Sequence, residues 1–196
     1  MSFSPKRHRW SIKVQDRYAI PIYKRIWPGA LIEPIAKYAI GNDRWGRRDF
    51  SGLDIIIALP QGTEIHLAQR FRSSDSGDDF SLRYKVPKLG GGLQESEYFK
   101  FLTAYKEGHW YPTHYAFGNT KFSLKEDPLK VNYEQGFSNF YVFKMGTLLR
   151  LISEGGLKYS GPYANPTPDG KLNGSSGVYF RLDDIPEEAV YFKLER

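Results

Sequence analysis

The sequence predicts a single α+β domain in which helices flank a central mixed sheet. Three observations support this fold class. The chain has 196 residues, a length that suits one domain with a sizeable core. Residues 52–72 have the pattern of an apolar hairpin, and further strand-like runs alternate with helix-like segments along the chain. No shift in composition divides the sequence, so we expect one domain over residues 1–196.

The first part of the chain is basic and then becomes apolar at helical spacing. Residues 1–17 carry several Lys and Arg around Trp10, and we expect an N-terminal arm or an edge strand there. From Leu31 to Ala39 the apolar residues recur with the period of a helix. Pro34 lies inside this pattern, so the helix is expected to start late or to be kinked. Glu33 lies next to the apolar stripe, at the rim of the core.

The hairpin is the most distinctive stretch of the sequence. Leu53 to Leu59 is an apolar, β-branched run, Pro60-Gln61-Gly62 interrupts it, and Glu64 to Phe71 alternates between polar and apolar residues. Asp54 stands near the start of the apolar strand. An ionised carboxylate in such a place is costly unless it is paired or binds a metal, so Asp54 is the first candidate for chemistry.

The second strand of the hairpin separates its side chains onto two faces. The two-residue period of a strand puts Glu64, His66, Ala68 and Arg70 on one face, and Ile65, Leu67, Gln69 and Phe71 on the other. The hairpin therefore offers a carboxylate, a histidine and a permanent cation together.

The remaining elements follow in chain order. Residues 80–86 alternate as a third strand, which we expect to join the hairpin in one largely antiparallel sheet. A helix between Ser96 and Gly108 is the clearest in the chain. We then expect strands at 110–117 and 140–143, a helix capped by Thr147, strands at 178–182 and 189–194, and a long loop over residues 157–177 that could cover a binding cleft.

The positive charge is concentrated in the N-terminal quarter of the chain. Residues 1–50 hold eleven Lys and Arg against four Asp and Glu, whereas the formal net charge of the whole chain is +6. This asymmetry favours nucleic acid as partner, with a solubilising terminus as the alternative. The residues that we expect to contact phosphates are Arg7, Arg9, Arg44, Arg47, Arg48 and Arg72.

Composition excludes several classes of protein. Cysteine is absent, which excludes disulfides, thiolate zinc sites and cysteine nucleophiles. No apolar run approaches the roughly 18 residues that a membrane-spanning helix needs, and no signal-like core follows the basic N-terminus. We therefore expect a soluble, intracellular protein of the cytoplasm with no membrane partner.

The segments DFSGLDIII, HLAQRFR and DFSLRY resemble small, phage-associated members of the restriction-endonuclease-like, or PD-(D/E)XK, nucleases. The resemblance covers roughly residues 25–120. It implies a metal-dependent endonuclease with Mg²⁺ or Mn²⁺, in which Asp54 takes the aspartate position, Glu33 the helix acid and Arg70 the lysine position. In such a site carboxylates hold the cation, which activates water and steadies the phosphate.

The sequence departs from that pattern at the third acid. Ala68 stands two residues before Arg70 and cannot bind a metal. Either Gln69 or Glu64 supplies the missing oxygen, or the site has lost catalysis. Arginine is also a poor substitute for a lysine that transfers protons, because it does not deprotonate.

Three hypotheses remain open at this point. The first is a nuclease that hydrolyses phosphodiester bonds in DNA. The second is a non-catalytic nucleic-acid-binding protein on a degenerate nuclease fold, which Ala68 favours. The third is an enzyme that acts on a nucleotide, with residues 157–177 as a lid. The sequence leaves open whether the chain acts as a monomer or as a homodimer.

Overall fold

The structure, a computed structural model, describes residues 5–35, 53–75, 79–87, 92–131, 136–166 and 172–194. It is mixed α+β, and its mixed sheet confirms the predicted class. The chain divides into two compact units. One unit takes Asp78–Tyr111 and Gly146–Glu187, and the other takes the segments on either side of these. The units are described in turn, and the expectation of one domain stays a prediction.

The larger unit begins with one continuous helix that runs from Pro5 to Ile26. It consists of α1 (Pro5–Val14), a π-helical turn η1 (Gln15–Ala19) and α2 (Ile20–Ile26). The π turn ends two residues before Pro21, which has no N–H to donate to the preceding turn. The predicted arm or edge strand at residues 1–17 is therefore wrong from residue 5 onward. Its basic composition concealed a helical spacing of buried residues at Trp10, Val14 and Tyr18.

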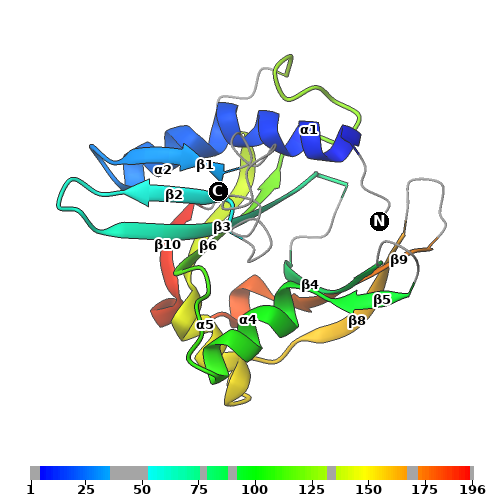
Figure 1. The fold of residues 1–196 in the computed structure, drawn as a ribbon. Coiled ribbons are helices and arrows are strands. Elements are labelled where there is room, and N and C mark those ends of the chain that lie inside the picture. The colour runs from blue at the N-terminus through cyan, green and yellow to red at the C-terminus, as the bar shows by residue number, and fades with distance from the viewer. Residues whose placement is uncertain are drawn as a thin grey trace. The chain divides into compact units, whose positions relative to one another are not determined.

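This helix covers one face of a six-stranded mixed sheet (Figure 1). The strands lie in the order β1-β2-β3-β6-β7-β10. All neighbouring pairs are antiparallel except β3 and β6, which run parallel. The strands are β1 (Leu31–Pro34), β2 (Ile55–Ala58), β3 (Glu64–Arg72), β6 (His114–Thr120), β7 (Phe137–Lys144) and β10 (Val190–Leu194).

The hairpin prediction is confirmed. β2 and β3 pair antiparallel, with Ile55 opposite Leu67. Gly62 has a φ of 86° in the turn, a conformation that glycine adopts without strain. The helix expected from Leu31 to Ala39 is wrong over its first four residues, because β1 pairs with β2 there. The strand ends at Pro34, which cannot donate a ladder hydrogen bond.

The core of this unit lies between the helix and the sheet. Its largest fully buried side chain from the helix is Tyr23, and the sheet contributes fully buried Ile57, Leu67 and Val142. Burying side chains of this size stabilises the fold by about 1.5–3 kcal/mol each relative to exposure. The helix is therefore held by packing of its apolar stripe and not by local propensity alone.

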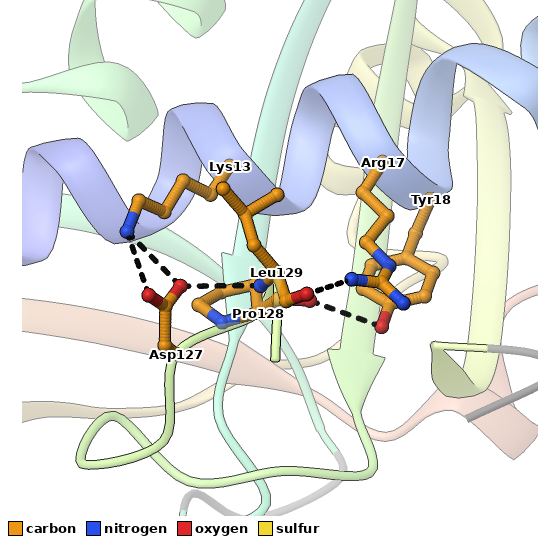
Figure 2. Close-up of polar contacts among 6 residues, drawn as sticks. All are labelled: Lys13, Arg17, Tyr18, Asp127, Pro128 and Leu129. Atoms are coloured by element: carbon orange, nitrogen blue, oxygen red, sulfur yellow. Dashed lines mark hydrogen bonds and ion pairs between the residues drawn. The ribbon is translucent and has the colours of Figure 1, made fainter. Parts of the chain in front are cut away.

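A segment that we call the strap, residues Lys121–Val131 after β6, runs along the flank of the helix (Figure 2). Lys13 Nζ lies 3.0 Å from Asp127 Oδ1, and the Arg17 guanidinium donates to the Leu129 carbonyl. Tyr18 Oη donates to the carbonyl of Pro128 at 3.2 Å. The strap is thus attached to the helix at three successive positions.

The smaller unit contains a four-stranded antiparallel sheet in the order β5-β4-β9-β8. Phe80 and Phe180 are fully buried across β4 and β9, and α4 packs on β4 and β5. The elements are β4 (Phe80–Pro87), β5 (Leu93–Glu95), α4 (Glu97–Lys106), α5 (Met145–Ser153), β8 (Ser160–Pro166) and β9 (Leu172–Phe180), followed by short 3₁₀ turns at Leu182–Asp184 and Glu187–Ala189.

The later predictions have mixed outcomes. The helix before Gly108 is confirmed as α4, the helix near Thr147 as α5, and the strands near 110–117, 140–143 and 189–194 are found with shifted bounds. The third strand exists as β4 but belongs to the second sheet, so one antiparallel sheet of three successive strands is wrong. The long loop at 157–177 is also wrong, because β8 and β9 occupy most of it. A lid there loses its basis.

Candidate functional site

Asp54 lies just before β2 and is held by both neighbouring strands. Its backbone N–H donates to the carbonyl of Leu67 on β3 at 3.0 Å, and its own carbonyl accepts from Ile35 N–H at 2.9 Å. Its carboxylate Oδ2 accepts from the backbone N–H of Gln69 at 2.6 Å. Hydrogen bonds of a carboxylate to backbone N–H groups are short and strong. The position of this carboxylate is therefore fixed where β1, β2 and β3 meet.

A network of polar side chains lies beside Asp54, beneath the helix. The carboxamide oxygen of Gln69 accepts from Tyr23 Oη at 3.1 Å, and its amide nitrogen donates to Gln15 Oε1. Tyr23 and Gln15 are both buried. Burial, and then the negative charge of Asp54, raise the pKa of Tyr23 well above its usual value. Tyr23 is therefore a neutral hydrogen-bond donor at every physiological pH.

Gln15 and Tyr23 are not among the site residues predicted from the sequence. A signal for them was present, since four buried residues recur at every fourth position through the helix, namely Gln15, Ala19, Tyr23 and Trp27. Gln15, the amide in that series, faces the sheet and belongs to the π turn. Single π turns within α-helices are frequent at functional sites, which makes Gln15 a member of the candidate site.

Glu33 and Arg70 belong to the face of the sheet that the helix does not cover, away from the Gln69 side chain. Glu33 pairs with Ile56, two residues after Asp54 in the chain. On β3 the side chains of Ile65, Leu67 and Phe71 enter the core beneath the helix, so Arg70 belongs to the opposite face with Ala68. Glu33 is on a strand and not on the predicted helix.

The two alternatives for the missing acid have different positions. Glu64 is opposite Ala58, four residues from Asp54 along β2, which is about 13 Å at the rise of a strand. Its carboxylate lies 3.2 Å from His66 Nε2. Gln69 is adjacent to Asp54, but it offers its backbone N–H there, while its carboxamide bonds to the helix.

The structure describes three of the six arginines that we expect to contact phosphates. Arg9 is exposed on α1, and Arg72 is half-buried at the end of β3. Arg7 also belongs to α1. The remaining three, Arg44, Arg47 and Arg48, lie outside the described residues.

The carboxylates of this region suit a hard cation in part. Mg²⁺ is usually bound by one or two carboxylates and takes its other oxygens from water and substrate phosphates. Asp54 and Glu33 supply two carboxylates from adjacent strands. Among the described residues no group of three or more His, Cys, Asp or Glu forms a metal site. Among the described residues the structure therefore does not bring Asp54 and Glu33 together with a third such ligand, and the Gln69 carboxamide, which is bonded to the helix, does not supply one.

A second cluster, on the β6 side of β3, contains a histidine. His114 pairs with Leu67 on β3, and its ring lies 4.9 Å from that of Tyr191, which stacks on Trp27 at 5.6 Å. Burial, and then the charge of Lys144, lower the pKa of His114 to about 4. His114 is thus neutral near pH 7, and rings surround it in place of carboxylates.

Comparison with known proteins identifies no relative. No protein-family model, no curated protein and no solved structure matches this chain. None of the helices in the described part of the chain is long and apolar enough to cross a membrane.

Proposed function

We propose that the protein is a metal-dependent nuclease that hydrolyses phosphodiester bonds in DNA. The observation that carries the proposal is the fixed carboxylate of Asp54, held by the Gln69 N–H at 2.6 Å at the start of a buried strand. Burying a carboxylate in such a position costs free energy unless the carboxylate is paired or binds a metal. A second carboxylate, that of Glu33, belongs to the adjacent strand.

The order of the elements supports a restriction-endonuclease-like fold for the larger unit. A helix is followed by three antiparallel strands, and the chain later returns as β6, parallel to β3. The resemblance stated above implies a helix, successive strands with the aspartate on the second, and a later return to the sheet. It also implies an acid on the first helix, where the residue that faces Gln69 is the amide Gln15.

In the proposed site Asp54 and Glu33 would hold Mg²⁺ or Mn²⁺, which when bound activates water and neutralises phosphate charge. The chain itself supplies orientation. Gln69 fixes the Asp54 carboxylate through its backbone, and Tyr23 and Gln15 fix Gln69. Arg70 stays charged at all relevant pH values, so its role is to attract and orient the phosphate and not to transfer a proton.

The test is a cleavage assay on single- and double-stranded DNA and RNA with Mg²⁺, Mn²⁺ or EDTA. We compare the wild-type chain with Asp54→Asn, which keeps the size and a hydrogen-bond acceptor but loses the charge. Glu107→Gln, an exposed acid in the smaller unit, is the matched control. We expect metal-dependent cutting of DNA that Asp54→Asn reduces at least 100-fold and that the control retains. Cutting that survives Asp54→Asn would refute the proposal.

A second function is favoured by one specific observation. The position expected for the third acid is Ala68, which is buried, and the Gln69 carboxamide next to it is bonded to the helix. We propose as the alternative a non-catalytic nucleic-acid-binding protein on the same fold. It predicts no cutting by any form of the protein, with binding that weakens steeply as salt rises. A homodimer stays a prediction under either function.

A further inference from the structure

The helix from Pro5 to Ile26 and the strap together carry a strong excess of positive charge. Only Asp16, Glu126 and Asp127 are acidic in these two segments. The basic residues whose side chains the structure describes are Arg9, Lys13, Arg17, Lys24, Arg25, Lys121, Lys125 and Lys130. A concentration of one sign of charge on adjoining elements attracts polyanions.

Three of the helix cations lie on one flank because of the helical period, and Lys24 and Arg25 follow them toward the end of the helix. Arg9, Lys13 and Arg17 each come one residue before a buried side chain, so they line the edge of the buried face. The strap is attached along this same edge, as Figure 2 shows for Lys13 and Arg17. The helix flank and the strap therefore form one continuous surface, which we call the basic track.

Part of the charge on the basic track lies at exposed side chains that form no recorded ion pair among the described residues. Arg17 donates to a neutral carbonyl, so its contact with the strap leaves its charge in place. Lys24, Arg25 and Lys125 are exposed, and none of the ion pairs recorded between described residues involves them, whereas the charge of Lys130 lies close enough to Asp127 to lower the pKa of that carboxyl. Like charges gathered on adjoining elements repel one another, and a bound polyanion would relieve this repulsion.

The length of the track matches a stretch of a nucleic-acid strand. From Arg9 to Lys24 the helix advances about 20 Å at its usual rise per residue. Phosphates of one DNA strand succeed each other every 3.4 Å along a duplex, so the track spans about six of them.

The rings of these segments indicate which form of nucleic acid the track suits. Proteins that bind single strands stack bases on exposed aromatic side chains. In the described helix and strap the aromatic residues Trp10, Tyr18, Tyr23 and Phe122 are all buried. Exposed cations without exposed rings suit the phosphates of a duplex, whose bases are already stacked.

We propose that the basic track is a docking surface for the sugar–phosphate backbone of double-stranded DNA. The proposal rests on the proposed function only for its choice of DNA as the polyanion. The track contacts phosphates and carries no sequence specificity of its own. It lies along the flank of the helix whose buried side holds Gln69 through Gln15 and Tyr23. Docking at the track and chemistry at Asp54 therefore involve separate residues.

The experiment measures binding of a labelled 20-base-pair duplex, and of one of its strands, by fluorescence anisotropy in EDTA, over a series of salt concentrations. The variants are Lys24→Glu with Arg25→Glu, and Lys125→Glu with Lys130→Glu. The matched control is Lys106→Glu with Lys158→Glu, which makes the same change in net charge at exposed positions of the smaller unit. Circular dichroism establishes that all three fold.

We expect each track variant to bind the duplex at least tenfold more weakly than the control variant at 0.1 M salt. The slope of log affinity against log salt should fall by about two in magnitude, since two phosphate contacts are lost. Equal weakening by the control variant, or binding of the single strand as tightly as the duplex, would overturn the proposal.

Parallel cleavage assays separate this proposal from the proposed function. Duplex binding that depends on the track, without any cutting, supports the track and rejects the nuclease. Cutting that depends on Asp54 but is unchanged by both track variants supports the nuclease and rejects the track.

Discussion

Removal of the Tyr23 hydroxyl tests whether the network beside Asp54 is a rigid part of the fold. Tyr23→Phe deletes one oxygen atom and leaves the ring, which is fully buried between the helix and the sheet. The deleted group donates to the Gln69 carboxamide at 3.1 Å. No cavity of side-chain size is created, so the measured effect is that of the hydrogen bond.

The magnitude follows from what the substitution leaves behind. A typical intramolecular hydrogen bond contributes about 1 kcal/mol, and a buried acceptor left without its donor costs about 1–3 kcal/mol. Gln69 is half-buried, so water can satisfy part of its need. We therefore expect Tyr23→Phe to lower the free energy of unfolding by about 1–2 kcal/mol.

The assay is urea unfolding followed by circular dichroism and fluorescence. Tyr105→Phe is the matched control, because Tyr105 is half-buried and no hydrogen bond of its hydroxyl is recorded among the described residues. A double-mutant cycle with Gln69→Met isolates the pairwise energy, which we expect to be at least 0.5 kcal/mol. A loss for Tyr23→Phe no larger than that of the control, together with zero coupling, would refute the argument.

Three further predictions follow from other parts of the larger unit. The pKa of His114 is lowered to about 4, so below about pH 6.5 the unfolded chain binds a proton that the folded chain does not bind. The free energy of unfolding therefore falls from pH 6.5 to pH 4. His114→Gln should remove about 1–2 kcal/mol of that loss, after allowance for partial exposure, in unfolding measured at both pH values. Asp127→Asn should loosen the strap, which hydrogen exchange would detect as faster exchange of the strap amides. The pKa of Asp127 is lowered, mainly by the hydrogen bond from Lys13, so the wild-type strap should loosen in the same way as pH falls through that pKa. Gly136→Ala would place a Cβ 2.3 Å from the Tyr18 ring and should destabilise the fold by about 2 kcal/mol in urea unfolding.

The parts of the fold that could be predicted from sequence depend on local pattern. The β2–β3 hairpin was predictable because its alternation and its turn lie within one stretch of 20 residues. The membership of β4 in a second sheet was not, since its partner β9 is about 100 residues later and no local pattern identifies it. The helix from Pro5 was missed for a different reason. Its basic composition suggested an arm or an edge strand, although its buried residues already had helical spacing.

The candidate site could also be predicted from the sequence only in part. The alternation on β3 predicts that Gln69 shares a face with Leu67 and Phe71, and this is confirmed, because Gln69 bonds to residues of the helix that covers that face. The sequence could therefore have separated the Gln69 side chain from Arg70 without a structure. It could not have shown that the Gln69 backbone reaches the Asp54 carboxylate. That contact depends on how β2 begins beside β3.

Asp54 has a structural task in addition to its proposed chemical one, and two substitutions separate them. Its carboxylate accepts the Gln69 N–H at the end of the β2–β3 pairing. Asp54→Ala removes this acceptor and should cost about 2 kcal/mol of folding stability, the usual range for a hydrogen bond to a charged group. Asp54→Asn keeps an acceptor and should cost about 1 kcal/mol or less.

The chemical task should affect the same two variants equally. Metal binding needs the negative charge, so Asp54→Asn and Asp54→Ala should be equally impaired in binding Mn²⁺, measured by calorimetry on the folded proteins. Asp54→Ala would then be less stable than Asp54→Asn, while the two variants would have the same affinity for Mn²⁺. Equal stability of both variants and the wild type would remove the structural role. Undiminished Mn²⁺ affinity in Asp54→Asn would remove the chemical role, and the fixed carboxylate would then serve only to end the strand pairing.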